Sequence, residues 1–187
     1  MEFVDPIRKT EDIKAMKKIL KRHSQRDLLF FVLGINTGLR VSDLLPLKVN
    51  DVWDSAGVRK FLYLTEPRTG EEHAFYLNRS VARELKAFLS TVDFDQQDYL
   101  FKSKKNNNPI TRQQAYRIVN QAAKDAGLTG KIGTHTLRKT FGYHAYRKGI
   151  AVSFIAKILN HHSSSETLRY IGIDKNDDHV VKVDVNL

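Results

Sequence analysis

The stretch from Leu28 to Leu33 reads Leu-Leu-Phe-Phe-Val-Leu and would be apolar on every side of a helix. Ser24 and Asp27 before it favour a helix start, and Gly38 ends the apolar pattern. A helix that is hydrophobic all round is stable inside a protein core or a membrane. Because this run is far too short to cross a bilayer, we expect a central helix that its neighbours bury.

Apolar residues at helical spacing, together with capping residues, predict further helices around this core. Ile13, Met16 and Leu20 share one face of a helix behind Thr10. The other expected helices are a short one around Val41–Leu45, then Arg79–Ser90, a helix from the capping box of Thr111 and Gln114 to Gly127, Thr134–Lys148, Val152–Leu159, and one that opens at Ser163–Glu166.

Two alternating, β-branched and aromatic segments, Val58–Leu64 and His73–Leu77, flank the turn residues Pro67 to Gly70. They predict a β-hairpin at about 58–77, within a three-stranded sheet. Lys102–Pro109 has the composition of a surface loop, and Val180–Val185 that of a short strand or an extended tail. The expected fold class is therefore α+β, mainly α, with a small antiparallel sheet.

The chain of 187 residues is 41% hydrophobic, enough for one core, so we expect a single domain over residues 1–187 with a C-terminal tail from about 173. It has no cysteines, which excludes disulfides, thiolate nucleophiles and Cys-based zinc sites. Met1–Lys9 lacks the apolar core of a signal peptide. We expect a cytoplasmic protein without a membrane partner.

Lys and Arg number 31 against 21 Asp and Glu, which gives a formal net charge of +10. This excess favours a polyanionic partner, with nucleic acid first and an anionic membrane surface second. Basic composition also serves solubility alone, so the charge raises the expectation of DNA binding without deciding it.

Two arginines and a histidine stand where they could hold a phosphate. His135 and Arg138 share one face at the start of a predicted helix, beside its partly positive N-terminus. Arg40 follows a glycine turn and leads into the next short helix, and arginine suits bidentate phosphate contact. Each motif also has an ordinary interpretation: a solvated helix face for the first pair, and an ion pair of Arg40 with Asp43 for the second.

His161 and His162 end one predicted helix, and Tyr170 follows His161 by nine residues in the next. The adjacent histidines could indicate a metal site, but no carboxylate stands at the spacing such a site needs. Hydrogen-bonding histidines are the better interpretation, and Tyr170 alone would be a half-buried packing residue.

Taken in order, Thr37-Gly38-Leu39-Arg40-Val41-Ser42-Asp43, then His135-Thr136-Leu137-Arg138, then Leu159-Asn160-His161 followed by Tyr170, closely resemble the tyrosine recombinase (phage integrase) family. The resemblance covers residues 10 to 172, and the order and spacing of the motifs together make it specific. It implies the catalytic fold of that family and a site-specific DNA recombinase or integrase that cleaves and rejoins DNA through a 3′-phosphotyrosine bond, with no metal or nucleotide cofactor.

The resemblance also implies a role for each matched residue. Tyr170 would be the nucleophile, Arg40 and Arg138 would grip the non-bridging phosphate oxygens, and His135 and His161 would handle protons. Asp43, where the family usually has glutamate, would orient its neighbours.

In the hairpin turn Arg68 replaces the lysine that serves the family as general acid. An arginine scarcely releases its proton near neutral pH, so Arg68 could donate a hydrogen bond but would be a poor general acid. We therefore expect either slower departure of the leaving group or a different residue in the role, for which Lys60 and Lys104 are weaker candidates.

The implied partner is double-stranded DNA, bound by a dimer or tetramer that exchanges C-terminal tails, in a protein of bacterial or phage origin. We expect DNA contacts from Lys104, Lys105, Arg112 and Lys139. Most members of the family carry an amino-terminal DNA-clamping domain, whereas this sequence begins at the catalytic part; it is either a short recombinase or a fragment.

Three alternatives remain open at this point. A DNA-binding regulator that has lost cleavage is supported by Arg68 alone. A type IB topoisomerase uses the same phosphotyrosine chemistry on single duplexes. A metal-dependent nuclease is disfavoured because the sequence lacks a carboxylate cluster.

Overall fold

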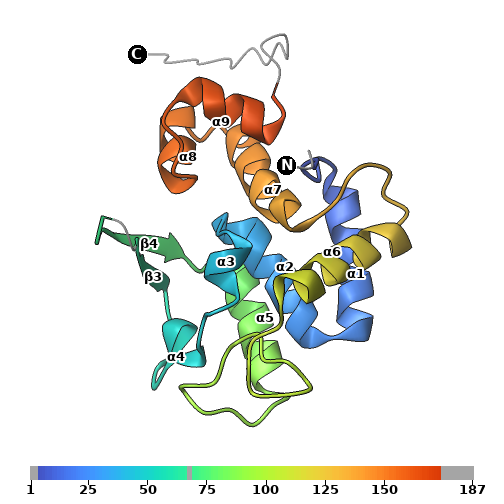
Figure 1. Ribbon diagram of the computed structural model, residues 1–187, viewed down its shortest axis with the longest axis vertical. Helices are drawn as coiled ribbons and strands as arrows, with labels where there is room; N and C mark the ends of the chain where they lie inside the picture. Colours follow the sequence, from blue (N-terminus) through green and yellow to red (C-terminus); the bar gives the residue numbers. More distant parts are fainter. Residues whose placement is uncertain (1–3, 67–68, 174–187) are drawn as a thin grey trace, which may run out of the picture.

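The computed structural model of the chain describes residues 4–66 and 69–173. Helices dominate it, and the strands are few and short (Figure 1). In chain order the elements are α1 (Thr10–His23), α2 (Gln25–Thr37), α3 (Val41–Leu44), α4 (Val49–Val52), β1 (Trp53–Asp54), β2 (Gly57–Val58), β3 (Phe61–Thr65), β4 (Glu72–Tyr76), α5 (Arg79–Leu89), α6 (Arg112–Asp125), α7 (Thr134–Arg147), α8 (Val152–Ile158) and α9 (Ser164–Ile171).

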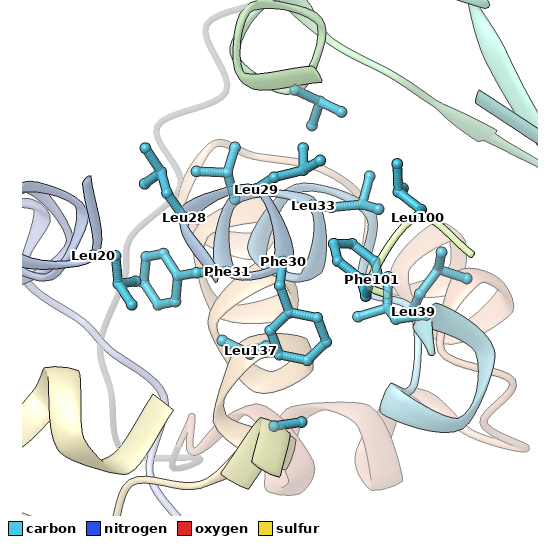
Figure 2. Packing of buried hydrophobic residues seen from close by; sticks show 14 of the residues in the cluster. Leu20, Leu28, Leu29, Phe30, Phe31, Leu33, Leu39, Leu100, Phe101 and Leu137 are labelled. Carbon is cyan, nitrogen blue, oxygen red and sulfur yellow. The ribbon is translucent and has the colours of Figure 1, made fainter. Parts of the chain in front are cut away.

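Helix α2 is the centre of the main hydrophobic core, as its composition predicts. The Ser24 hydroxyl accepts a hydrogen bond from the Asp27 N–H, and Gly38 ends the helix in a left-handed conformation. Leu28 is 2% exposed, and the five residues that follow it are fully buried. Helices α1, α5 and α7 pack around α2, and Figure 2 shows its side chains pointing outward on all sides into these neighbours. The main core is therefore built around this helix.

The mixed fold with small antiparallel sheets is confirmed, but the expected three-stranded sheet is wrong for the residues described. Strands β3 and β4 form the predicted hairpin, whereas Val58 pairs with Trp53 in a separate two-stranded ladder, β1 with β2. Gly57, with a φ of 105°, makes the tight turn that folds Val58 back onto β1. The predicted segment Val180–Val185 lies outside the described residues.

A second, smaller hydrophobic cluster joins the last three helices. It consists of Ile155, Leu159, Ile171 and Ile173, and the partly buried Tyr170 packs against it. Within residues 4–66 and 69–173, no helix is long and apolar enough to cross a membrane.

Gly142 lets α9 approach α7 closely inside this cluster. A Cβ atom placed at Gly142 would lie 2.6 Å from the Ile171 Cγ2 and 3.2 Å from the Leu159 Cδ1. These neighbours are buried, so they have little room to move. The absence of a side chain at position 142 therefore sets the distance between the helix that carries Arg138 and the helix that carries Tyr170.

We expect Gly142→Ala to lower the free energy of unfolding by about 1–3 kcal/mol, the usual cost of overpacking a core. Urea titration followed by circular dichroism measures it. Ser153→Thr, which adds a methyl group at an exposed position of α8, is the control and should stay within about 0.5 kcal/mol of the native protein. A Gly142→Ala protein as stable as the control would mean that α7 and α9 can accommodate a Cβ at position 142 without strain.

Candidate active site

Arg138 lies where the three sequence motifs meet. It is 7% exposed, and its guanidinium donates hydrogen bonds to the carbonyl oxygens of Gly38 and Leu159. Gly38 belongs to the Arg40 motif and Leu159 to the His161 motif, so one side chain links segments that are 100 and 21 residues away. Burial lowers the pKa of Arg138, but a guanidinium remains charged at neutral pH.

Tyr170 stands in the last turn of α9, with its hydroxyl beside the Arg138 side chain, whose charge and N–H groups favour the ionised form of that hydroxyl. Ser163 caps the start of α9 by accepting from the Glu166 N–H. Burial raises the pKa of the Tyr170 hydroxyl, while the charges of Arg138 and Arg40 act in the opposite direction. The tyrosine oxygen therefore lies in contact with one guanidinium and in the field of a second.

Arg40 is exposed at the start of α3, and its guanidinium is not tied up in the ion pair considered above. The Asp43 carboxylate instead accepts a hydrogen bond from the Arg40 backbone N–H at 3.2 Å and one from the Ser42 hydroxyl at 3.3 Å. Asp43 thus holds the backbone at Arg40, and the orienting role expected of it stays a prediction.

His135 lines a hollow together with the two arginines. A hollow of about 130 Å³ is lined by Arg40, Arg112, Thr134, His135 and Arg138, among others. His135 is exposed on its open side, yet desolvation of the covered side lowers its pKa, with further lowering by Arg138, Lys139 and Arg40. The hollow is thus lined by cations and by a histidine that favours its neutral form.

His161 contacts the tyrosine ring directly. Its ring meets that of Tyr170 edge to face at a centroid distance of 4.8 Å, and its Nδ1 lies 3.1 Å from the Thr167 hydroxyl oxygen. Asn160 before it has a φ of 47°, the left-handed conformation that asparagine tolerates. Burial lowers the pKa of His161, and the nearby Glu166 acts against that.

The backbone N–H of His162 donates to the Glu166 carboxylate. Across the described ranges, no cluster of three or more His, Cys, Asp or Glu residues could hold a metal ion.

The residues expected to contact DNA are placed unequally. Lys104 and Lys105 are exposed in the 102–109 loop, and Lys60 is exposed at the start of the hairpin. Lys139 differs from the expectation, because it is 5% exposed and its Nζ donates to the Val4 carbonyl oxygen instead of projecting from the surface. Residue 68 lies outside the described residues, so the general-acid question for Arg68 stays a prediction.

Sequence reasoning missed part of the surroundings of the two arginines. A second hollow of about 310 Å³ is lined by Arg40 and Arg138 together with His73, Lys157 and Glu72. The signal was available, since strand alternation places His73 on the same side of β4 as the core-facing Phe75.

A tyrosine hydroxyl beside a buried arginine, with a second arginine and two histidines around it, is chemically suited to phosphoryl transfer. The donors suit the charge that develops on a phosphate under attack, and a tyrosine oxygen is a group that can attack phosphorus. Fold and site together define the class of strand-transfer enzymes that work through a phosphotyrosine.

Comparison with known proteins agrees with this enzyme class. The phage integrase family matches residues 8–177, so the chain belongs to that family, the tyrosine recombinases and integrases. The probable integrase/recombinase YoeC of Bacillus subtilis strain 168 is 44% identical over 94% of this chain and 93% of its own length. The expectation of a tyrosine recombinase is confirmed at the level of family and enzyme class.

Solved structures share the fold. The crystal structure of XerA recombinase matches with a TM-score of 0.75 and 24% identity, over 94% of this chain and 61% of that one. A lambda integrase tetramer bound to a Holliday junction matches with a TM-score of 0.66 and 20% identity, over 99% of this chain and 52% of that one. The chain therefore spans little more than half of these larger recombinases.

The lowered pKa values of His135 and His161 predict acid sensitivity. In the unfolded chain these histidines take up a proton near their ordinary value of 6.5, whereas the folded protein resists protonation until lower pH. Stability should therefore be unaffected by them above that value and should fall as pH drops from 6.5 to the folded-state pKa.

The measurement is urea unfolding at about pH 7.5 and about pH 5.5, a window chosen to span the histidine titration. The double variant His135→Gln and His161→Gln should lose less stability between the two pH values than the native protein. His23→Gln, at an exposed position in the last turn of α1, serves as control and should behave as native. An equal loss in native and double variant would assign the acid sensitivity to other groups.

Proposed function

We propose that this chain cleaves and rejoins double-stranded DNA at specific sites, with Tyr170 as nucleophile and no metal or nucleotide cofactor. The observation that carries the proposal is the position of the Tyr170 hydroxyl beside Arg138, whose guanidinium is anchored on the two other motifs. A nucleophile and its charge-stabilising donor are in contact before any substrate arrives.

In the proposed reaction the Tyr170 oxygen attacks the scissile phosphorus while a neutral histidine of the site, His135 or His161, accepts the phenol proton. The bond from phosphorus to the 5′ oxygen breaks, the 5′ oxygen takes up a proton, and a 3′-phosphotyrosine remains. Arg40 and Arg138 stabilise the charge that builds on the non-bridging oxygens, while His135 and His161 hold and move protons. Attack by the 5′-hydroxyl of a second DNA end reverses these steps, so the phosphotyrosine supplies the bond energy for joining.

We further propose that the protein acts as a dimer or tetramer on DNA that exchanges C-terminal tails, in the cytoplasm of a bacterial or phage-infected cell. The lambda integrase tetramer on a Holliday junction gives this assembly a precedent on the same fold. On this chain Phe154 in α8 is 66% exposed and Ile150 before α8 is 46% exposed, which leaves apolar surface for a segment of a second copy. Exposed Lys104, Lys105 and Arg112 would contact phosphates.

Tyr170→Phe should abolish covalent protein–DNA adducts and leave DNA affinity nearly unchanged, because only the nucleophilic oxygen is removed. Adducts are detected by denaturing gel electrophoresis after incubation, in a chelator, with a nicked suicide substrate that prevents rejoining. Tyr146→Phe, on α7, is the matched control and should form adducts at the native rate. Adducts in the Tyr170→Phe protein would overturn the assignment, and a native protein that binds DNA without forming them would support the regulator alternative.

Arg40→Ala should slow adduct formation by about 10²–10³-fold, the usual effect of removing one preorganised donor at an oxyanion. Its exposed position makes this loss purely catalytic, so the melting temperature should not change. Arg138→Ala should lose both activity and stability, because it leaves two backbone carbonyls without their donor. Single-turnover rates and thermal melts separate the two effects, and a loss below tenfold for Arg40→Ala would make it a structural residue.

Arg68→Lys should speed cleavage or leave it equal, because lysine keeps the charge and can also release a proton. A substrate whose leaving 5′ oxygen is replaced by sulfur needs no general acid and should accelerate the native protein more than the variant. Arg79→Lys, the same substitution at an exposed position at the start of α5, is the control. Equal acceleration of native and Arg68→Lys proteins would move the search to Lys60, Lys104 and His73.

A further inference from the structure

The segment Val4–Arg8, which we term the strap, is hydrogen-bonded to helix α7 and to the residues before it, ahead of the start of α1. The Asp5 N–H donates to the Lys131 carbonyl at 2.9 Å, and the Ile7 N–H donates to the Thr140 hydroxyl at 2.9 Å. The Ile7 carbonyl oxygen also lies 2.9 Å from the His144 Nε2. Figure 1 shows the start of the chain beside α7, on the side of the molecule where α7 leads up to α9.

Lys139 connects the strap to the tyrosine. This side chain is 5% exposed, its Nζ donates to the Val4 carbonyl at 2.8 Å, and the same Nζ lies over the Tyr170 ring, 5.2 Å from its centroid. A cation over an aromatic face is attractive, more so where both are shielded from water. The ring of Tyr170 is therefore held by an ammonium over its face, while the His161 ring meets it edge to face.

Arg8 connects the strap to the end of the nucleophile helix. Its Nη2 donates to the Gly172 carbonyl at 2.7 Å, and its guanidinium lies 5.4 Å from the centroid of the Tyr143 ring on α7. Gly172 is the left-handed C-cap of α9, with a φ of 75°, two residues beyond Tyr170. A Cβ at position 172 would lie 3.0 Å from the same Nη2, so the close approach of Arg8 depends on this glycine.

We propose that Arg8 and Lys139 are positioning residues for Tyr170, and that the strap holds the nucleophile helix in the geometry required for attack. The proposal rests on the proposed role of Tyr170 as nucleophile. Helix α9 has 8 residues, too few to be stable without tertiary contacts, so its placement depends on what holds its two ends. Ser163 caps the first end, and Arg8 binds the carbonyl that ends the other.

The role assigned to Lys139 explains why it is buried although the site would bind a polyanion. The ammonium of Lys139 lies against the face of the Tyr170 ring instead of on the surface. Removing it takes away this contact, while the Tyr170 hydroxyl stays beside Arg138. The expected defect is therefore one of nucleophile placement, distinct from weaker DNA binding or a weaker general acid.

The first test needs no DNA. The protein is labelled with 3-fluorotyrosine, and the resonances of its seven tyrosines are assigned with single Tyr→Phe variants. Arg8→Met should shift or broaden the Tyr170 and Tyr143 resonances and leave the others in place, although Arg8 contacts only the backbone beyond Tyr170. Lys9→Met, the exposed neighbour, should change none of them. A Tyr170 resonance unmoved by Arg8→Met would overturn the proposal.

The second test measures cleavage. Arg8→Met and Lys139→Met should each slow single-turnover adduct formation by about ten- to a hundredfold, the range for a nucleophile displaced by up to about 1 Å. The substrate with a 5′ sulfur leaving atom should not rescue either variant, because the general acid is intact, and DNA affinity should match that of Lys9→Met. Arg8→Lys, which keeps a donor, should recover part of the rate.

The outcomes separate this proposal from the proposed function. Rates equal to that of Lys9→Met, or full rescue by the sulfur substrate, would overturn the positioning role while native cleavage still supports the recombinase. If the native protein forms no adducts, the proposed function fails, and the fluorine spectra alone decide whether the strap sets the position of Tyr170. Should Lys139→Met fold poorly, Arg8→Met decides, since Arg8 is exposed.

Discussion

The geometry of the site depends on the guanidinium of Arg138. Its two terminal nitrogens bind carbonyl oxygens from the end of α2 and from the end of α8, and the same group meets the Tyr170 hydroxyl. A buried charge is stable only where hydrogen bonds replace the water that it has lost. Each of the three segments thus supplies a neighbour to one cation, which couples the position of Tyr170 to the fold.

Helix α2 makes that arrangement possible because it fixes where Gly38 lies. Its apolar side chains fill the core on every side, so its end is placed by packing with α1, α5 and α7 together. A Cβ at Gly38 would lie 2.5 Å from the Phe141 ring, and the positive φ at this position is one that glycine adopts readily. The turn delivers its carbonyl to Arg138 and, two residues later, delivers Arg40 to the hollow.

The sequence predicted those parts of the structure that local chemistry decides. The capping box of Thr111 and Gln114 and the all-round apolar run of α2 specify their helices without help from the rest of the chain. Two-residue strands such as β1 carry too little pattern to detect, so Val58 was assigned to the wrong ladder. The proximity of Tyr170 to Arg138 can be predicted only from the resemblance to a family. The burial of Lys139 depends on a hydrogen bond to the Val4 carbonyl, and no sequence pattern near residue 139 indicates that bond.

The charges around the hollow also bear on how the site responds to a phosphate. Burial lowers the pKa of His135, and the charges of Arg138, Lys139 and Arg40 lower it further, so the free protein favours the neutral form of this histidine. A phosphate in the hollow would offset those cations and raise the pKa of His135 again. DNA binding would then be linked to proton uptake. The bound phosphate raises the pKa of His135, and by reciprocity the protonated histidine raises the affinity for the phosphate. His135 would take up a proton when a DNA phosphate enters the hollow. The same cations that lower the pKa of His135 in the free protein would attract that phosphate.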